Sequence, residues 1–341
     1  MSPPPMRPSP DVGVVIAGTG SALPEQIVTN ADLEKVMDTS DEWIVQRTGV
    51  RIRRRIDRTR GESTLSLGAG ALRNALAAAN ASARDLDMII CATMTADMPC
   101  PPTACQIAHA VDAGQAAAFD LSAACSGFVY GLNIAHDLIR VGSNKAIGVI
   151  ASDCLSTLLD YSNAGRSTAI IFGDGAAAAV LRACDDPSKG LLAQSMHSEG
   201  AGWKDIFVPN CPQDFPEGIP FDPAKLRKVQ MNGAGVFKFA VTTFPNVIQE
   251  TLDKAKLKAA DIDMFVCHQS NARILAAARE RFGITEDKLY VNIDRYGNTS
   301  AASVPLCLDE LIRAGRITPG MKVLFVAFGG GLTWGCSIWQ M

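Results

Sequence analysis

Three residues in this chain, Cys125, His268 and Asn298, have side chains of types that can take part in catalysis. Cys125 stands among small residues in "LSAACSGF" (121–128), directly after "AAAFDL" (116–121), at a predicted strand-to-helix turn. The N-terminus of a helix can stabilise a nearby thiolate by up to about 2 kcal/mol, which lowers a thiol pKa by roughly 1.5. We therefore expect Cys125 to be close to half ionised at neutral pH and to act as a nucleophile.

Each of the three residues, taken alone, also has a structural interpretation. A cysteine among small residues at a helix start is more often structural than catalytic, and Asn298 in "YGNTS" fits a turn. His268 follows a predicted buried strand (264–267) and could cap the next helix. What favours catalysis is the joint placement of the three residues by an internal repeat.

The second half of the chain repeats the first. "DLDMIICATM" (85–94) returns as "DIDMFVCHQS" (261–270), and "IGVIA" (147–151) returns as "VLFVA" (323–327), both after 176 positions. "DLIRVG" (137–142) returns as "ELIRAG" (310–315) after 173 positions. Three matches in the same order predict two structurally equivalent halves. An offset of 173 relates Cys125 to Asn298, so we expect these two residues to lie at equivalent turns. Both turns, together with His268, should then line one site.

The elements that position these residues follow from the apolar pattern. Continuous apolar strands, such as 88–92 and 264–267, alternate with helices, which predicts α/β structure with sheets covered on both faces. A helix beginning at Cys125 has an apolar face and ends at Gly142. We expect a first half over residues 12–185 and a second over 186–341, after a disordered proline-rich tail at 1–11.

Composition excludes several classes of function. The net charge is −3, which gives no reason to expect a nucleic-acid partner. Six arginines in "RIRRRIDRTR" (51–60) indicate a solvated edge or, alternatively, a surface for an acidic partner. The chain has 10 cysteines without CxxC spacing and 4 histidines, which favours free thiols, no metal site and a cytoplasmic location. No apolar run is long enough to insert into a membrane, and "GTGS" (18–21) lacks the rest of a dinucleotide fingerprint.

From about residue 13 to residue 341 the sequence resembles the β-ketoacyl-acyl-carrier-protein synthase III family of thiolase-fold condensing enzymes. The motifs that carry the resemblance are "TSDEWIVQRTG" (39–49), "AACSGF" (123–128), "GRSTAIIFGDGAAAAVL" (165–181), "HQSN" (268–271), "YGNTSAAS" (296–303) and "AFGGGLTWG" (327–335). The resemblance implies duplicated halves in α-β-α-β-α layers. It also implies a decarboxylative Claisen condensation of an acyl-CoA primer with malonyl-acyl-carrier-protein, which initiates fatty acid biosynthesis. Acyl-CoA is then a substrate, and no cofactor is expected.

The resemblance assigns roles to residues at the matching positions. Cys125 would be acylated, His268 and Asn298 would stabilise the enolate, and the N–H groups of Cys125 and Gly330 would form an oxyanion hole. The residues expected to hold CoA are Thr39, Trp43, Arg47, Arg166 and Asn271. Those expected to meet the acidic carrier protein are Lys238, Arg273, Arg279 and Arg281. The family also implies a homodimer, in which the apolar loop "ADMPCPPTACQ" (96–106) is covered by the partner.

Two departures from the family pattern are present in the sequence. The usual "HQAN" is "HQSN" here, and Ala234 stands where the family often has a polar or basic residue, which puts one ligand contact in doubt.

The sequence also allows other functions. The order Cys, His, Asn along the chain fits a cysteine peptidase, although the "CGSCW" surround is missing. The motifs are compatible, too, with a catalytically inactive family member that serves as a binding subunit, and with a condensing enzyme of secondary metabolism that uses acyl-CoA.

Overall fold

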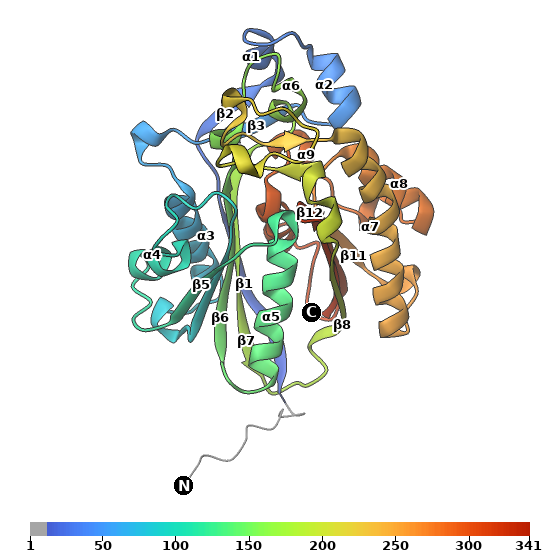
Figure 1. The fold of residues 1–341 in the computed structure, drawn as a ribbon. Helices are drawn as coiled ribbons and strands as arrows, with labels where there is room; N and C mark the ends of the chain where they lie inside the picture. Colours follow the sequence, from blue (N-terminus) through green and yellow to red (C-terminus); the bar gives the residue numbers. More distant parts are fainter. Residues whose placement is uncertain (1–11) are drawn as a thin grey trace.

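The computed structural model describes residues 12–341, and the tail predicted at 1–11 lies outside them. Two sheets form the framework (Figure 1). The first has the strand order β1-β7-β6-β4-β5, and its strands are β1 (Gly13–Ala22), β4 (Met88–Ala92), β5 (Ala117–Leu121), β6 (Ala146–Cys154) and β7 (Asp174–Cys184). The second has the order β11-β12-β13-β8, from β8 (Gly190–Ser198), β11 (Met264–Cys267), β12 (Lys322–Gly329) and β13 (Thr333–Gln340).

The two sheets have the same combination of parallel and antiparallel strand pairs. β4 pairs in parallel with β5 and β6, and β11 pairs in parallel with β12, whereas β7 and β13 run antiparallel to their neighbours. All nine residues of β6 and all four of β11 are buried. Strands buried on both faces need helices on both sides, as the continuous apolar runs predicted.

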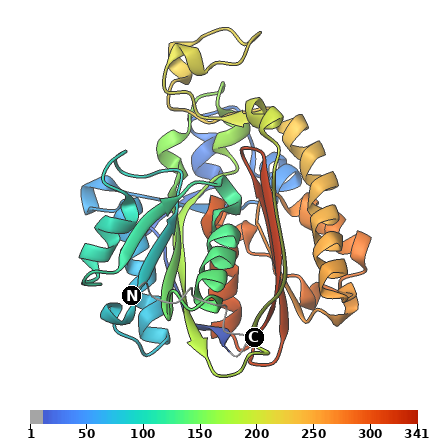
Figure 2. The same ribbon diagram turned by 60° about the horizontal axis from the view of Figure 1, so that its bottom comes forward.

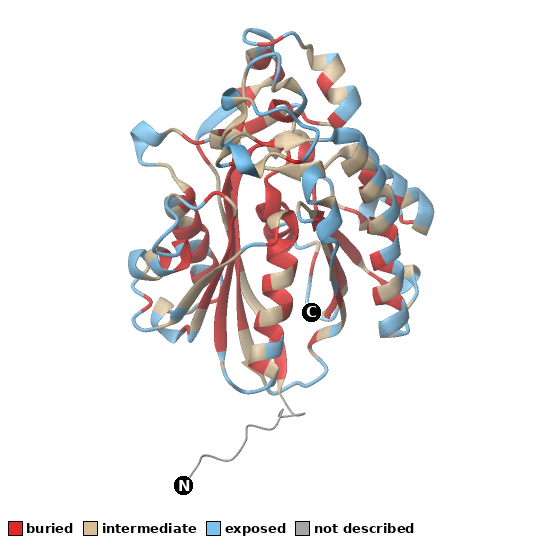
Figure 3. Cartoon of the chain, viewed as in Figure 1, coloured by how far each residue is buried: buried red, intermediate tan, exposed pale blue. Residues whose placement is uncertain are grey.

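Helices form three layers around the sheets. α3 (Thr64–Ala78) and α4 (Thr103–Ala110) cover the outer face of the first sheet. α5 (Gly127–Arg140) and α10 (Ser303–Arg313) lie between the sheets, where Figure 3 shows α5 largely buried. α7 (Gly233–Ala255) and α8 (Ala272–Phe282) cover the second sheet and expose their outer faces. The expected α-β-α-β-α layering is confirmed.

Shorter elements cap one end of the sheets. They are α1 (Asn30–Glu34), α2 (Asp41–Thr48), α6 (Arg166–Ala169), α9 (Ile293–Tyr296) and the strand pair β2 (Gln26–Thr29) and β3 (Ile52–Arg55). The segment between β8 and α7, yellow in Figure 2, projects from the body and contains β9 (Ile206–Phe207) and β10 (Gln230–Met231). Edge-to-face aromatic contacts hold it together, with ring centroids 5.4–6.3 Å apart, from Trp203 through Phe207 and Phe215 to Phe221.

The structure corrects the register of the internal repeat. The central helices begin at Gly127 and Ser303, and a 3₁₀ turn precedes each, Ala124–Ser126 and Ser300–Ala302. These starts lie 176 positions apart, as do the strand matches. α10 has 11 residues and α5 has 14, so only the helix ends follow the offset of 173. The predicted equivalence of Cys125 and Asn298 is therefore wrong, because Asn298 precedes its turn.

The arginine run at 51–60 lies mostly at the surface, since Arg51, Arg55, Arg58 and Arg60 are exposed, but Arg53 is buried. Arg53 is only 3% exposed, its guanidinium donates to the Ile170 carbonyl and to Asn30 Oδ1, and burial lowers its pKa to about 10. The Arg55 guanidinium lies 4.8 Å from the centre of the Tyr161 ring, and Arg60 pairs with Glu25. The expectation of a solvated edge is wrong for Arg53.

None of the helices described in residues 12–341 has the length and apolar composition needed to cross a membrane. The 10 cysteines are free thiols, and those at 91, 125, 154, 267, 307 and 336 are buried.

Candidate active site

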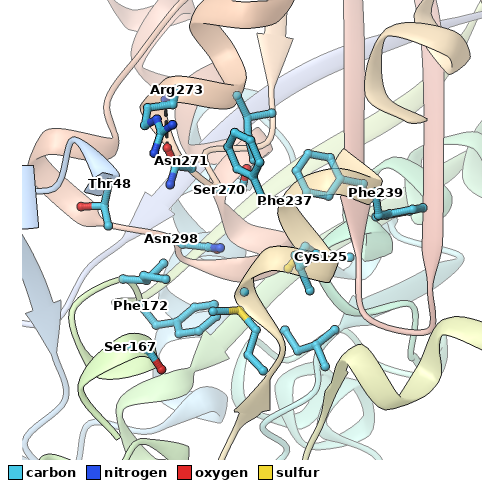
Figure 4. A pocket seen from close by; sticks show the side chains of 18 of the residues that line it. Thr48, Cys125, Ser167, Phe172, Phe237, Phe239, Ser270, Asn271, Arg273 and Asn298 are labelled. Carbon is cyan, nitrogen blue, oxygen red and sulfur yellow. Dashed lines mark hydrogen bonds between the residues drawn. The ribbon is translucent and has the colours of Figure 1, made fainter. Parts of the chain in front are cut away.

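A cavity of about 430 Å³ is lined by residues of α2, of the turn before α5 and at the ends of β11 and β12. Cys125, His268 and Asn298 all line it, so the three residues that the sequence singled out lie together. In Figure 4 the Asn298 amide nitrogen is on the side that faces Cys125. The convergence is confirmed even though the offset used to predict it was wrong.

Cys125 sits in the 3₁₀ turn that leads into α5, two residues before the helix begins. The turn requires an uncommon backbone at Ala124, where φ is +46°. The end of β12 packs against the turn, since a Cβ on Gly329 would lie 2.6 Å from the Cys125 nitrogen. Only glycine allows this approach of β12. Gly330, the predicted oxyanion residue, is the next residue and lines the cavity.

The Cys125 thiol is protonated at neutral pH. Burial raises its pKa from 9.0 to about 12. A helix N-terminus lowers a thiol pKa by only about 1.5 even in favourable geometry, which is half of the increase caused by burial. The expectation of a half-ionised thiol is therefore wrong, because the sequence placed Cys125 at a helix start but did not reveal how deeply it is buried.

His268 follows β11 directly, and its N–H donates to the Val326 carbonyl (2.8 Å), which continues the pairing of β11 with β12. Its ring lies edge-on to Phe328, with centroids 5.4 Å apart, and its Nδ1 is 2.7 Å from Ser303 Oγ. Burial lowers the pKa of His268 to about 3, so the imidazole is neutral. The helix-cap interpretation is wrong, since Asn271 caps α8 by accepting from the Arg273 N–H (2.9 Å).

Asn298 is held by the turn that follows it. Its Oδ1 accepts a hydrogen bond from the Ser300 N–H (2.8 Å), and Ser300 has a φ of +53°. Its own N–H donates to the Ile171 carbonyl (2.9 Å), beside a bridge to Phe172. With Oδ1 occupied, the amide NH₂ group is the part of the side chain that is free to donate into the cavity.

Most of the cavity wall is apolar, and no motif in the sequence indicated it. Its apolar lining includes Phe172, Ile206, Phe237, Phe239, Phe328 and Leu332. Phe172 lies in the 165–181 motif, and Phe237 and Phe239 lie in "MNGAGVFKF" (231–239), where only Ala234 drew comment. Ala234 lines the cavity in the first turn of α7 and therefore offers a methyl group where a polar contact was in doubt.

The predicted CoA residues fall into two groups. Trp43, Arg47 and Asn271 line the cavity, and Asn271 Nδ2 donates to the Arg47 carbonyl (2.9 Å), which joins α2 to α8. Arg166 lies outside the lining, but its guanidinium stacks on the Trp43 ring at 4.8 Å from the centre, as Arg47 does at 4.5 Å. Thr39 is also outside the lining, and its buried hydroxyl has no partner among residues 12–341.

The predicted carrier-protein residues are on α7 and α8. Lys238 and Arg273 are exposed, and the Arg273 guanidinium stacks on Phe237, 5.2 Å from the ring centre, at the cavity wall. Arg279 forms an ion pair with Glu286 (2.6 Å), and Arg281 donates to Asn246 Oδ1 (3.2 Å). Arg273 is therefore the member of this set that lies at the cavity itself.

Comparisons with known proteins identify close relatives. The family model described as 3-oxoacyl-[acyl-carrier-protein (ACP)] synthase III matches residues 119–200, and its C-terminal counterpart matches residues 252–341. The chain is 45% identical over 323 residues to beta-ketoacyl-[acyl-carrier-protein] synthase III of Caldanaerobacter subterraneus subsp. tengcongensis, which covers 95% of this chain and 96% of that protein.

Two solved structures are similar along their whole length. The 3-oxoacyl-[acyl-carrier-protein] synthase III from Aquifex aeolicus VF5 has a TM-score of 0.88 and 39% identity, over 97% of this chain and 100% of that one. The priming beta-ketosynthase of the R1128 polyketide biosynthetic pathway has a TM-score of 0.90 and 33% identity, over 99% of both chains.

Proposed function

Because this chain belongs to the 3-oxoacyl-[acyl-carrier-protein] synthase III family, we propose that Cys125, His268 and Asn298 are its catalytic residues. The protein is an acyltransferase with a thiolase-like fold. It condenses an acyl-CoA primer with malonyl-acyl-carrier-protein and so initiates fatty acid biosynthesis. The observation that carries the assignment of residues is the meeting of one thiol and two hydrogen-bonding side chains in a single cavity. The family assignment also rules against a cysteine peptidase.

In the first half-reaction the Cys125 sulfur attacks the thioester carbonyl of acyl-CoA. The negative oxygen of the tetrahedral intermediate accepts hydrogen bonds from the N–H groups of Cys125 and Gly330. The C–S bond to CoA then breaks, and the thiol proton of Cys125 ends on the departing CoA sulfur. The product is an acyl-Cys125 thioester.

In the second half-reaction malonyl-acyl-carrier-protein replaces CoA in the cavity. Its carboxylate leaves as carbon dioxide, and the electron pair of the broken C–C bond forms an enolate. The imidazole of His268 and the amide of Asn298 donate hydrogen bonds to the enolate oxygen. The enolate carbon attacks the acyl-Cys125 carbonyl, the bond between that carbonyl and the Cys125 sulfur breaks, and the released thiolate takes a proton from water.

The two substrates contact different residues around the cavity. Trp43, Arg47, Arg166 and Asn271 suit the nucleotide and the pantetheine arm of CoA, because an indole stacks on a base and guanidinium groups bind phosphates. Thr39 is kept as a CoA contact on the resemblance of its motif alone. Lys238, Arg273, Arg279 and Arg281 provide positive charge for an acidic carrier protein.

Three further features of the protein are part of the proposal. It forms a homodimer in the cytoplasm, and the partner covers the loop at 96–106, where Met98 is 43% exposed. The boundary between its two halves lies at residue 185, in the connection between β7 and β8. Light scattering of a dilute sample tests the oligomeric state, and a monomer would contradict it.

The direct test of the function is a condensation assay with purified components. Acyl-CoA primers of several lengths are combined with malonyl-acyl-carrier-protein, and the β-ketoacyl product is measured by mass spectrometry. We expect product with acyl-CoA and none when the primer is carried by acyl carrier protein. Hydrolysis of the thioesters without a new carbon–carbon bond would contradict the function.

The similarity to a polyketide priming ketosynthase supports a second candidate, a role in secondary metabolism. The same assay separates the two candidates when malonyl groups are presented on the carrier protein of fatty acid synthesis or on a polyketide carrier protein. A preference for the first favours fatty acid initiation.

A further inference from the structure

We infer that Ser303 is a positioning residue that holds His268 with its proton on Nε2, and this inference rests on the enolate role proposed for His268. Ser303 is the first residue of α10, it is 2% exposed, and its Oγ lies 2.7 Å from Nδ1 of His268. A neutral imidazole has one N–H and one bare nitrogen, so the direction of this hydrogen bond decides which nitrogen faces the substrate as a donor.

The neighbouring backbone determines that direction. The N–H of Gln269 also donates to Ser303 Oγ, at 3.3 Å. If Nδ1 carried the imidazole proton, Oγ would accept two hydrogen bonds and its own proton would need another acceptor. Among residues 12–341 the hydroxyl has no hydrogen-bond partner other than His268 and Gln269. The hydroxyl proton therefore points to Nδ1, which leaves the imidazole proton on Nε2.

The backbone of Gln269 is held in this orientation, because hydrogen bonds fix both the amide nitrogen and the amide oxygen of the Gln269 side chain. Gln269 Nε2 donates to the carbonyls of Cys267 (3.0 Å) and Tyr290 (3.2 Å), and its Oε1 accepts from the Asn292 N–H (3.0 Å). Gln269 is fully buried. The backbone N–H of Gln269 therefore donates to Ser303 Oγ, and the Ser303 hydroxyl donates its own proton to His268 Nδ1.

The two proposed enolate donors are thus set by one short segment, residues 298–303. The Ser300 N–H occupies Oδ1 of Asn298, and the Ser303 hydroxyl occupies Nδ1 of His268. In both cases an acceptor atom is satisfied inside the protein and a donor is left for the cavity. A further consequence is that His268 cannot take the proton of Cys125 in this tautomer, because its Nε2 already carries one.

The test combines a direct observation of the tautomer with kinetics of Ser303→Ala. In protein labelled with ¹⁵N-histidine, two-bond ¹H–¹⁵N correlations distinguish a protonated ring nitrogen from a bare one, and His268→Ala identifies the signals of His268. We expect a protonated Nε2 and a bare Nδ1 in the wild type, and a mixture of tautomers in Ser303→Ala. A wild-type imidazole protonated on Nδ1 would overturn the inference without any variant.

Ser303→Ala should slow decarboxylation of malonyl-acyl-carrier-protein about 10-fold, or about 1.4 kcal/mol, which is the usual contribution of one neutral hydrogen bond. Acylation of Cys125 by acyl-CoA should change less than about 2-fold, since it does not use the Nε2 proton. Ser337→Ala is the matched control, because Ser337 is equally buried and its hydroxyl has no partner among residues 12–341.

The outcomes separate this inference from the proposed function. Unchanged decarboxylation and an unchanged tautomer in Ser303→Ala would overturn the role of Ser303 alone. Full decarboxylation by His268→Ala would instead overturn the proposed role of His268. An equal loss in Ser303→Ala and Ser337→Ala would reduce Ser303 to a structural residue.

Discussion

Replacing His268 and Asn298 one at a time should separate the two half-reactions at a single active site. His268→Ala and Asn298→Ala each remove one donor to the enolate oxygen, and the loss of one such donor typically lowers a rate by about 10²- to 10³-fold. Asn298→Asp is a sharper version, because it keeps the size of the side chain and removes its donors. We expect decarboxylation to fall by this factor in each variant.

The same variants should still be acylated by acyl-CoA. The Cys125 thiol lies in its own turn before α5, and the N–H groups proposed for the oxyanion hole belong to Cys125 and Gly330. His268 is neutral, since burial lowers its pKa to about 3, so its loss removes no positive charge that would stabilise a thiolate. Acylation should therefore remain within roughly 10-fold of the wild type, well short of the loss in decarboxylation.

Cys125→Ala should show the opposite pattern, with no condensation but continued decarboxylation, because both enolate donors remain. The assay is release of labelled carbon dioxide from malonyl-acyl-carrier-protein, run beside intact-mass measurement of acylation. The loss in His268→Ala should also be constant from about pH 5 to 9, because the imidazole does not titrate in that range. Full decarboxylation by His268→Ala would refute the reasoning, since His268 would then serve only the thiol.

Charge and burial lead to three more predictions. Alkylation of Cys125 by iodoacetamide should accelerate about 10-fold per pH unit from 7 to 9, because burial raises its thiol pKa to about 12; a plateau near pH 7 would mean that the helix terminus outweighs burial. Burial also raises the pKa of Asp153 to about 6, above its unfolded value near 4, so the folded protein binds the extra proton. The contribution of Asp153 to the free energy of unfolding should therefore fall as the pH rises from about 4 to 6, so the wild type should lose stability relative to Asp153→Asn when both are measured by denaturant titration at pH 4 and 7; an unchanged difference between the two proteins would contradict the assignment. Arg273→Glu should raise the KM for malonyl-acyl-carrier-protein in a salt-sensitive way and leave acylation by acyl-CoA intact; a parallel loss in both half-reactions would place Arg273 on the CoA path.

The sequence was most informative where a signal is local. The bounds of β4 (Met88–Ala92) and β11 (Met264–Cys267) were predicted as the structure has them, because a continuous apolar run indicates a buried strand without information from the rest of the chain. The helix start near Cys125 was displaced by the 3₁₀ turn at 124–126, since residue types do not distinguish the tighter turn. The repeat gave the right convergence through the wrong offset, because α10 ends one turn early.

What the sequence could not supply depends on three-dimensional packing. The high pKa of Cys125 and the low pKa of His268 both arise from burial by segments far along the chain, which a motif does not reveal. The hydrogen bond from Ser303 to His268 joins residues 35 positions apart. Ser303 is part of the "YGNTSAAS" motif, but nothing in its type or spacing identifies its partner.

Peptide mapping after incubation with an acyl-CoA primer tests the central claim most directly. The purified protein is mixed with acetyl-CoA or a longer acyl-CoA, digested, and analysed by mass spectrometry for the mass of the acyl group on each of the 10 cysteines. The account predicts label on Cys125 and its removal when malonyl-acyl-carrier-protein is added. Label on another cysteine, such as the exposed Cys105 or the buried Cys267, or an acyl group that malonyl-acyl-carrier-protein does not remove, would contradict it.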